Sequence, residues 1–348
     1  MVPFAGWQMP LRYGSETAEH QAVRHAAGLF DLSHMGEITV TGAEAGQALD
    51  YALTGYLSAM APGRARYTMI CAADGGVLDD LVVYRLGEQE FLVIANAANT
   101  AVVFDELVSR ASEFDAVVTD ATDDYALIAV QGPAAAGILG PLVDGVDLGA
   151  MKYYAGAAGS VAGFPVWVAR TGYTGEDGFE VFARPADAVA IWDALVAAGT
   201  PAGLIPAGLA ARDTLRLEAG MPLYGNELGP DLTPFEAGLG RVVKFDKAGD
   251  FVGRSALAVL AAAGPARRLV GLTIQSRRIP RHGYPVLADG VVCGTVTSGA
   301  PSPTLGQPIA MAYLNAGPGA DDAVLAVDIR GEAVPAQLTE LPFYSRSR

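Results

Sequence analysis

Two adjacent carboxylates, Asp79 and Asp80, lie inside an apolar run that follows the glycine turn Gly75-Gly76. The β-branched and aromatic residues 81–84 that come next predict a largely buried strand. Side chains on a strand alternate between two faces, so we expect one acid to face water and the other a cleft or the interior. A carboxylate in an apolar wall is costly unless it is partnered or takes part in chemistry. The alternative is an edge strand whose acids cap neighbouring amides.

The run R-T-G-Y-T-G-E-D-G-F-E over residues 170–180 has the glycine spacing of a phosphate loop but not its context. A phosphate loop opens into a helix whose N-terminus holds the anion. This run opens into a predicted strand, and it carries Glu176 and Asp177, which would repel phosphate. A carboxylate at Glu180, just after a glycine turn, suits a guanidine-like donor edge such as the 2-amino and N3–H pair of a pterin ring.

Arg212 and Arg216 are spaced i, i+4 and therefore share one face of a predicted helix. A solvated face with internal salt bridges is the usual outcome of such a run. Four aromatic residues lie near turns or strand ends beside the acids. Such aromatics often pack in the core, but together they suggest a slot for a flat ring, and they are Tyr67, Tyr84, Tyr173 and Tyr224.

No metal site is predicted. His20 and His25 are five residues apart, which is not the spacing that places two ligands on one helix face. Residues 31–34 contain Asp, Ser and His too close together on one segment to form a triad, so a structural or ligand-lining role is expected there. Cys71 and Cys293 are the only cysteines, which favours a reducing, cytoplasmic location over a disulfide framework.

Composition places the chain among globular proteins of two or three domains. Its 348 residues are 51% hydrophobic and 18% charged, with a formal net charge of −15. That charge disfavours nucleic acid, whose phosphates bind lysine and arginine. No apolar run reaches the roughly 18 residues of a membrane span, and no signal peptide is predicted. The densest basic groups are Arg267-Arg268 and Arg277, Arg278 and Arg281.

The pattern of elements predicts an α+β fold with largely antiparallel sheets. Helices are expected over residues 15–26, 43–53, 99–111, 185–198 and 206–218, and strands over residues 37–40, 64–70, 77–86, 90–95, 126–130, 166–169 and 179–182. The aromatic segment 4–13 is expected to be a buried loop or short strand. Residues 261–265 read as a linker, after which residues 269–338 have the short, turn-punctuated strands of a small barrel or sandwich.

Segments along essentially the whole chain resemble the aminomethyltransferase (T-protein) family of the glycine cleavage system. In order, they are MVPFAGWQMPLRY (1–13), GLFDLSHMGE (28–37), RARYTM (64–69), GGVLDDLVVYR (75–85), NAANT (96–100), QGP (131–133), RTGYTGEDGFE (170–180), GLAARDTLRLEAGMPLYGNE (208–227), TPFEAGLG (233–240), GTVTSGAPSP (294–303) and LPFY (341–344). Members usually carry a short leader before the first segment, whereas this chain begins at Met1.

The resemblance implies a clover-like arrangement of three domains. Two interleaved α+β domains would form residues 1–260, and a β-barrel-like domain would form residues 265–348. Matched position by position, Asp80 corresponds to the essential carboxylate beside the folate N5, Tyr67 and Asn96 to folate-pocket positions, and Glu180 to the pterin-binding acid. Arg212 corresponds to a substrate-binding arginine, and Tyr344 to a further folate-site position.

The implied reaction moves an aminomethyl carbon from a dihydrolipoyl arm on the carrier H-protein to tetrahydrofolate, with release of ammonia and formation of 5,10-methylenetetrahydrofolate. H-protein and the other glycine cleavage components are the implied partners. Alternatives are a folate-dependent demethylase on the same fold or a non-enzymatic folate-binding relative. Lipoyl carriers are typically acidic, so the arginines at 267–281 are expected to help dock the carrier.

Overall fold

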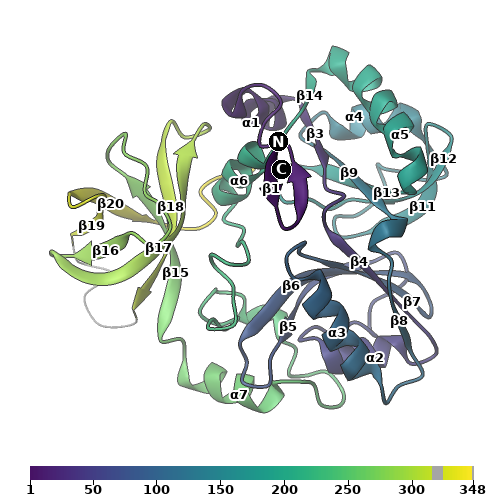
Figure 1. The fold of residues 1–348 in the computed structure, drawn as a ribbon, viewed down its shortest axis with the longest axis horizontal. Coiled ribbons are helices and arrows are strands. Elements are labelled where there is room, and N and C mark those ends of the chain that lie inside the picture. Colours follow the sequence, from purple (N-terminus) through teal and green to yellow (C-terminus); the bar gives the residue numbers. More distant parts are fainter. Residues whose placement is uncertain (316–323, 347–348) are drawn as a thin grey trace.

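The computed structural model of the chain describes residues 1–315 and 324–346. It contains a five-stranded sheet, a seven-stranded sheet, a closed barrel and a two-stranded N-terminal hairpin. Figure 1 shows the barrel on the left and the two sheets on the right, one above the other, with helix α6 (Leu209–Glu218) between barrel and sheets. The predicted α+β class with largely antiparallel sheets and a C-terminal barrel is therefore confirmed.

The five-stranded sheet has the order β5-β6-β7-β4-β8, and all of its pairings are antiparallel. Gly75, with φ +95°, makes the predicted turn between β5 and β6 in a conformation that suits glycine. Helices α2 (Ala45–Ala52) and α3 (Thr100–Ala111) cover one face. The strands are β4 (Gly36–Thr41), β5 (Ala65–Cys71), β6 (Val77–Gly87), β7 (Glu90–Ala95) and β8 (Val117–Asp120).

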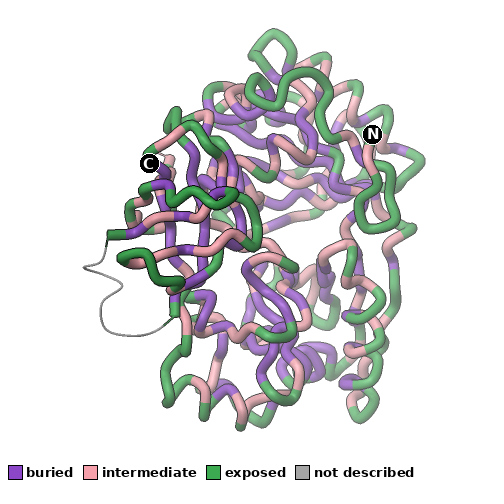
Figure 2. The backbone as a smooth tube through the Cα atoms, turned by 60° about the vertical axis from the view of Figure 1, so that its left-hand side comes forward, coloured by how far each residue is buried: buried purple, intermediate pink, exposed green. Residues whose placement is uncertain are grey.

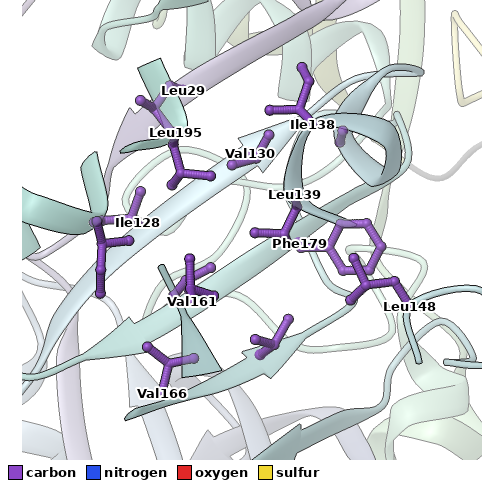
Figure 3. Close-up of a cluster of buried hydrophobic side chains, with 14 of the residues drawn as sticks. Leu29, Ile128, Val130, Ile138, Leu139, Leu148, Val161, Val166, Phe179 and Leu195 are labelled. Carbon is purple, nitrogen blue, oxygen red and sulfur yellow. The ribbon is translucent and has the colours of Figure 1, made fainter. Parts of the chain in front are cut away.

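The seven-stranded sheet has the order β10-β11-β12-β13-β9-β3-β14. Its outer face packs on α4 (Ala135–Leu139) and α5 (Pro185–Gly199) through a core that Figure 3 shows around Val130 and Phe179. Only β14 pairs in parallel, with β3. The strands are β3 (Ala27–Asp31), β9 (Ala126–Gln131), β10 (Val143–Asp144), β11 (Gly156–Val161), β12 (Phe164–Ala169), β13 (Gly178–Ala183) and β14 (Leu204–Pro206).

The two sheets are interleaved along the chain. After α1 (Glu16–His25), β3 enters the seven-stranded sheet, strands β4 to β8 then build the other sheet, and β9 returns to pair with β3. The two sheets pack against each other through the faces that helices α2 to α5 do not cover. Buried side chains such as Phe30, Tyr84 and Phe182 fill the contact. Figure 2 shows buried residues through the interior of the molecule and exposed residues mainly on its outer loops.

The barrel begins at β15 (Arg267–Ile274) and closes in the order β15-β18-β17-β16-β19-β20. Its other strands are β16 (Pro285–Ala288), β17 (Val291–Ser302), β18 (Gln307–Asn315), β19 (Leu325–Asp328) and β20 (Ala333–Thr339). The predicted linker at 261–265 is in part the end of helix α7 (Arg254–Ala263), which the sequence pattern did not predict. None of the helices in the described residues is long and apolar enough to cross a membrane.

Two further predictions needed correction. The segment expected to be buried at 4–13 forms the hairpin β1 (Val2–Phe4) and β2 (Trp7–Met9), and Phe4 and Trp7 are 39% and 41% exposed. The helix expected from residue 206 begins at 209, because Leu204–Pro206 pairs with β3 as strand β14. The remaining short turns are 3-10 helices at Thr122–Asp124, Gly140–Leu142, Thr200–Ala202 and Gly240–Val242.

A buried cluster of charged groups joins α1 and α6 to the barrel. Arg24 donates to Glu218 at 2.9 Å and to Glu176 at 3.0 Å, and His20 contacts Glu218 at 3.1 Å. From the end of β17 and the residues just beyond it, Ser302 and Thr304 also donate to the Glu218 carboxylate, at 2.5 and 2.7 Å. We call these six residues the junction. They fix the barrel against the α1 and α6 layer.

Candidate active site

A cavity of about 550 Å³ lies where the two sheets and the segment after α6 meet. Its wall combines β5 and β6 from one sheet, β13 from the other, and residues 220–224. Segments far apart in the sequence thus converge on one volume that is large enough for a small-molecule ligand. The predicted site residues that line it are Tyr67, Asp80, Tyr84, Asn96, Tyr173, Glu180, Arg212 and Tyr224.

Asp80 lies on β6 with its side chain on the face that borders the cavity. Its Oδ2 accepts a hydrogen bond from the Tyr67 hydroxyl at 2.9 Å, and its Oδ1 accepts one from the Asn96 amide at 2.9 Å. Both donors are uncharged, so they orient the carboxylate without neutralising it. Burial raises the pKa of Asp80 to about 6, and the hydrogen bonds from Tyr67 and Asn96 oppose that rise. The carboxylate is therefore ionised at neutral pH and more basic than an ordinary aspartate.

Asp79 occupies the opposite face of β6 and is 0% exposed. Its carboxylate accepts hydrogen bonds from the Asn96 backbone N–H at 2.9 Å, the Asn96 side-chain amide at 2.9 Å and the Asn99 amide at 2.7 Å. Burial, and then the nearby Asp80 carboxylate, raise the pKa of Asp79 to about 7. Alternation along the strand is thus as predicted, but neither acid faces open water, and the two are joined through Asn96 rather than separated.

Glu180 on β13 forms another wall of the cavity. Its Oε2 accepts hydrogen bonds from the Tyr84 hydroxyl at 3.1 Å and from the Thr171 hydroxyl. Among the described residues no donor reaches its Oε1, which leaves that oxygen for a ligand. Thr171 is carried by the glycine-rich loop, where a Cβ on Gly172 would fall 1.9 Å from the Gln131 Oε1. A side chain at position 172 would have to displace the buried Gln131 amide, which bonds to Thr171 and Thr174.

Arg212 on α6 places its guanidinium over the Tyr173 ring, with Cζ 4.7 Å from the ring centroid. The Tyr173 hydroxyl donates to the Pro222 carbonyl, which fixes the ring. No carboxylate of the described part of the chain forms an ion pair with Arg212. Arg216, one turn further along, is paired with Glu227 at 3.0 Å and with Asp213. Of the two predicted arginines, one is thus open to the cavity and the other is held in structural ion pairs.

Tyr344 is the predicted site residue that does not line the cavity. Its ring stacks on Arg24, with 4.1 Å between the Arg24 Cζ and the ring centroid, and its N–H donates to the Glu218 carbonyl at 2.8 Å. Leu341 and Phe343 pack against the barrel residues Ile309 and Met311 and direct the tail to the junction. The structure thus places the Tyr344 ring at the junction, and its predicted folate-site role stays a prediction.

The sequence predicts a structural or ligand-lining role for residues 31–34, and it assigns no role to Glu37. His34 lines the cavity, its Nδ1 has no hydrogen-bond partner in the described residues, and burial, then Arg212, lower its pKa to about 4. Glu37 on β4 is 1% exposed, and burial raises its pKa to about 9. At neutral pH the histidine is therefore neutral and the glutamic acid is protonated. No cluster of potential metal ligands is found within residues 1–315 and 324–346.

Comparison with known proteins covers nearly the whole chain. Residues 1–247 match the GCVT N-terminal domain, and residues 267–345 match the glycine cleavage T-protein C-terminal barrel domain. The aminomethyltransferase of Streptomyces avermitilis is 64% identical over 352 residues, which cover 100% of this chain and 94% of that protein. The aminomethyltransferase of Streptomyces coelicolor is 63% identical over 354 residues, with the same coverage of 100% and 94%.

A solved structure is similar to this chain over nearly its whole length. The crystal structure of the glycine cleavage system aminomethyltransferase T from Bartonella henselae has a TM-score of 0.90 and 36% identity, and the match covers 99% of this chain and 93% of that one. The family predicted from the sequence motifs is thereby confirmed. This chain belongs to the aminomethyltransferase (T-protein) family of the glycine cleavage system.

Proposed function

We propose that the chain transfers the aminomethyl carbon of a dihydrolipoyl arm, carried by H-protein, to tetrahydrofolate, releasing ammonia and forming 5,10-methylenetetrahydrofolate. The observation that carries the proposal is the Asp80 carboxylate, which is oriented by two uncharged donors at the edge of a cavity of about 550 Å³. Tetrahydrofolate supplies the nucleophilic nitrogen that receives the carbon. The residues of the chain bind, orient and exchange protons around that transfer.

Asp80 acts as the base and as the electrostatic stabiliser of the reaction. A carboxylate whose pKa is about 6 is ionised at neutral pH yet basic enough to accept a proton from the attacking nitrogen. Its negative charge also stabilises positive charge that develops on the transferred carbon. Since the cavity wall beside it is apolar, at Val82 and Ile94, that stabilisation is less screened than it would be in water.

Glu180 holds the donor edge of the pterin ring. Its Oε2 is already occupied by the hydroxyls of Tyr84 and Thr171, so the carboxylate has a fixed orientation. Its Oε1 accepts no hydrogen bond within the described residues, so both lone pairs of that oxygen can accept N–H groups of the pterin edge. Tyr67, Tyr173 and Tyr224 supply flat apolar walls for the ring.

Arg212 offers the cavity a positive charge with no protein carboxylate beside it in the described structure, which fits an anionic part of a substrate. Asn96 orients Asp80, and the Asn96 side chain also borders the cavity. The carrier H-protein and the other glycine cleavage components are the proposed partners, and the cytoplasm is the proposed location. The carrier binds transiently and presents its arm beside Asp80.

The experiment compares Asp80→Asn with Asp123→Asn, a matched loss of one negative charge at an exposed position. An asparagine at position 80 can still accept from Asn96 and can donate to the Tyr67 oxygen, so the variant should fold. We expect tetrahydrofolate binding within about threefold of the parent but turnover with aminomethyl H-protein at least ~10²-fold slower, the scale of a positioned acid or base. Ammonia release and 5,10-methylenetetrahydrofolate formation are measured. Parent-like turnover by Asp80→Asn would overturn the role of Asp80.

A further inference from the structure

Asp79 has an environment unlike that of any other residue on its side of β6. The neighbours on that face, Leu81 and Val83, belong to the apolar core under α2 and α3. An apolar side chain at position 79 would continue that core. The chain instead buries a carboxylate at 0% exposure, and its hydrogen-bond donors are all amide groups. A buried acid without a neighbouring cation is unfavourable for folding alone, so its partners indicate what it does.

Those partners fix the orientation of the Asn96 side chain. The Asn96 Nδ2 lies 2.9 Å from the Asp79 Oδ1, 2.9 Å from the Asp80 Oδ1 and 3.2 Å from the Asp80 carbonyl oxygen. All three are acceptors, so the amide nitrogen, not the amide oxygen, must face them. One hydrogen points to Asp79, and the other is then directed to Asp80. The backbone N–H of Asn96 donates to Asp79 as well, which holds the residue at both ends.

The sheet register makes this arrangement possible. Val82 of β6 is opposite Ile94 of β7, so Asn96, two residues on, is opposite Asp80. It lies at the point where β7 ends and the chain turns toward α3, whose N-cap residue Asn99 also donates to Asp79 at 2.7 Å. The carboxylate of Asp79 therefore ties together the end of β7, the start of α3 and, through Asn96, the acid in the cavity.

We propose that Asp79 is a positioning residue for the reaction: it holds the Asn96 amide so that one N–H stays directed at the Asp80 carboxylate. The inference rests on the proposed function, because it assigns Asp79 a role in turnover through Asp80. Asp79 does not touch the substrate, since Asp79 is fully buried and is not part of the cavity wall. A carboxylate is needed there because it can only accept, and three N–H groups converge on it.

The isosteric change Asp79→Asn tests this directly. Its amide would place an NH₂ group either against the Asn96 backbone N–H or against the two side-chain amides, so one donor would face another and Asn96 would turn away. We expect turnover to fall about 10- to 100-fold, as when a supporting group lets a reacting group shift. The tetrahydrofolate dissociation constant should change less than about threefold, because Asp79 lies outside the cavity.

A double-mutant cycle separates positioning from general damage. If Asp79 acts only through Asp80, the combined Asp79→Asn, Asp80→Asn variant should turn over as slowly as Asp80→Asn and no slower. A purely structural role would make the two losses multiply. Multiplied losses, or parent-like turnover by Asp79→Asn, overturn the proposal.

A second variant keeps the test decisive if Asp79→Asn does not fold. Asn96→Ala removes the linking amide and leaves both carboxylates, so it should lower turnover by a similar factor of about 10 to 100. Parent-like turnover by Asn96→Ala also overturns the inference. A parent enzyme that releases no ammonia from aminomethyl H-protein would overturn the proposed function and this inference together. An active parent with an equally active Asp79→Asn variant would overturn only the inference.

Discussion

At the cavity wall Asp80, and behind it the buried Asp79, accept hydrogen bonds from amides and a hydroxyl, whereas at the junction Glu218 contacts Arg24 and His20. Burial acts on the acids of both regions in the same direction, toward a higher pKa. Uncharged donors only partly oppose it, so the pKa of Asp80 is about 6 and that of Asp79 about 7. At the junction, burial is outweighed by the contacts with His20, Ser302 and Thr304, and the pKa of Glu218 falls to about 2.

The difference separates acids that are kept for chemistry from acids that hold the fold. A paired carboxylate stabilises the folded state but has too low a pKa to accept a proton at neutral pH. A carboxylate held by neutral donors has the reverse properties: it costs folding free energy and remains basic. Removing a charged group should therefore lower the stability of the fold at the junction and raise it at the cavity.

The largest effect is expected at the junction. Arg24→Met keeps the length of the side chain but leaves Glu218 and Glu176 buried without the guanidinium that both contact. Breaking a buried pair in this way should lower the free energy of unfolding by about 3 to 5 kcal/mol. Urea denaturation at pH 7 measures it, with Arg12→Met, an exposed arginine, as the control. A loss below about 1 kcal/mol would mean that the junction does not hold the barrel to α1 and α6.

Glu180 should dominate recognition. Glu180→Gln keeps an oxygen for the Tyr84 and Thr171 hydroxyls but turns an NH₂ group toward the pterin donors. Losing a charged, buried hydrogen-bond pair should weaken tetrahydrofolate binding by about 2 to 4 kcal/mol. Calorimetric or fluorescence titration measures the dissociation constant, and Glu113→Gln, at an exposed position, is the control. An unchanged dissociation constant would refute the placement of the pterin edge.

Asp80 should show how much a buried carboxylate without a neighbouring cation lowers the stability of the fold. Its pKa of about 6 in the fold exceeds the ordinary value of 3.8, so the folded state holds that proton more tightly than the unfolded state does. The ionised carboxylate therefore lowers stability above about pH 6, and the penalty fades as the pH falls toward the ordinary value. Asp80→Asn lacks this penalty and should be more stable than the parent by about 1 to 3 kcal/mol at pH 7.

The difference in stability between Asp80→Asn and the parent should also depend on pH. The stability gain of Asp80→Asn should shrink between pH 6 and pH 4, and parent turnover should fall across the same range as Asp80 takes up its proton. Urea denaturation at several pH values and a pH–rate profile provide the measurements. An Asp80→Asn protein that is less stable than the parent at pH 7 would show that Asp80 is held as a structural acid, like Glu218.

Local patterns predicted the strand that carries Asp80, the glycine turn before it and the all-β tail, because each depends on neighbours in sequence. They did not predict β3, whose pairing with β9 joins residues about a hundred positions apart. They also give no indication that Glu37 is buried. It alternates with Ile38 and Val40, so the pattern favours a solvent face, yet the second sheet covers that face.

The motif match located most of the cavity residues but could not reveal how they are supported. The link from Asp79 through Asn96 depends on the register of β6 against β7, and the sequence does not specify that register. The position of the Tyr344 ring depends on tertiary contacts in a similar way. The direction of the tail is set by the packing of Leu341 and Phe343 on the barrel, which is a tertiary contact.

Substitutions of the barrel arginines are expected to have the smallest effect of those considered. These arginines are the densest basic groups of an otherwise acidic protein. Arg267 is not part of a free patch, because it pairs with Glu236 at 2.9 Å and stacks on Tyr313. Arg278 pairs with Glu332 at 2.6 Å. Arg277 and Arg281 are exposed, and neither forms an ion pair within the described residues. Arg268 lies on β15, so within the loop between β15 and β16 the predicted docking patch retains these two side chains without an ion pair.

Contacts connect that loop to the cavity wall. His282 bonds to the Thr297 carbonyl at 2.8 Å, and the adjacent Ser298 accepts from Asn226 at 2.9 Å, two residues beyond the cavity residue Tyr224. A carrier attracted to Arg277 and Arg281 would thus dock beside a segment that is linked to the cavity wall.

Reversing both charges, with Arg277→Glu and Arg281→Glu, leaves the Arg278–Glu332 pair intact. It should raise the Michaelis constant for H-protein several-fold, about 1 kcal/mol, at low salt and by less at 0.15 M salt, where the screening length is about 8 Å. The turnover number and tetrahydrofolate binding should not change, because the loop is not part of the cavity wall. Arg12→Glu with Lys152→Glu makes the same change in net charge on the body, at exposed positions without an ion pair in the described residues, and is the control. If that control raises the constant equally, net charge rather than this loop governs association with the carrier.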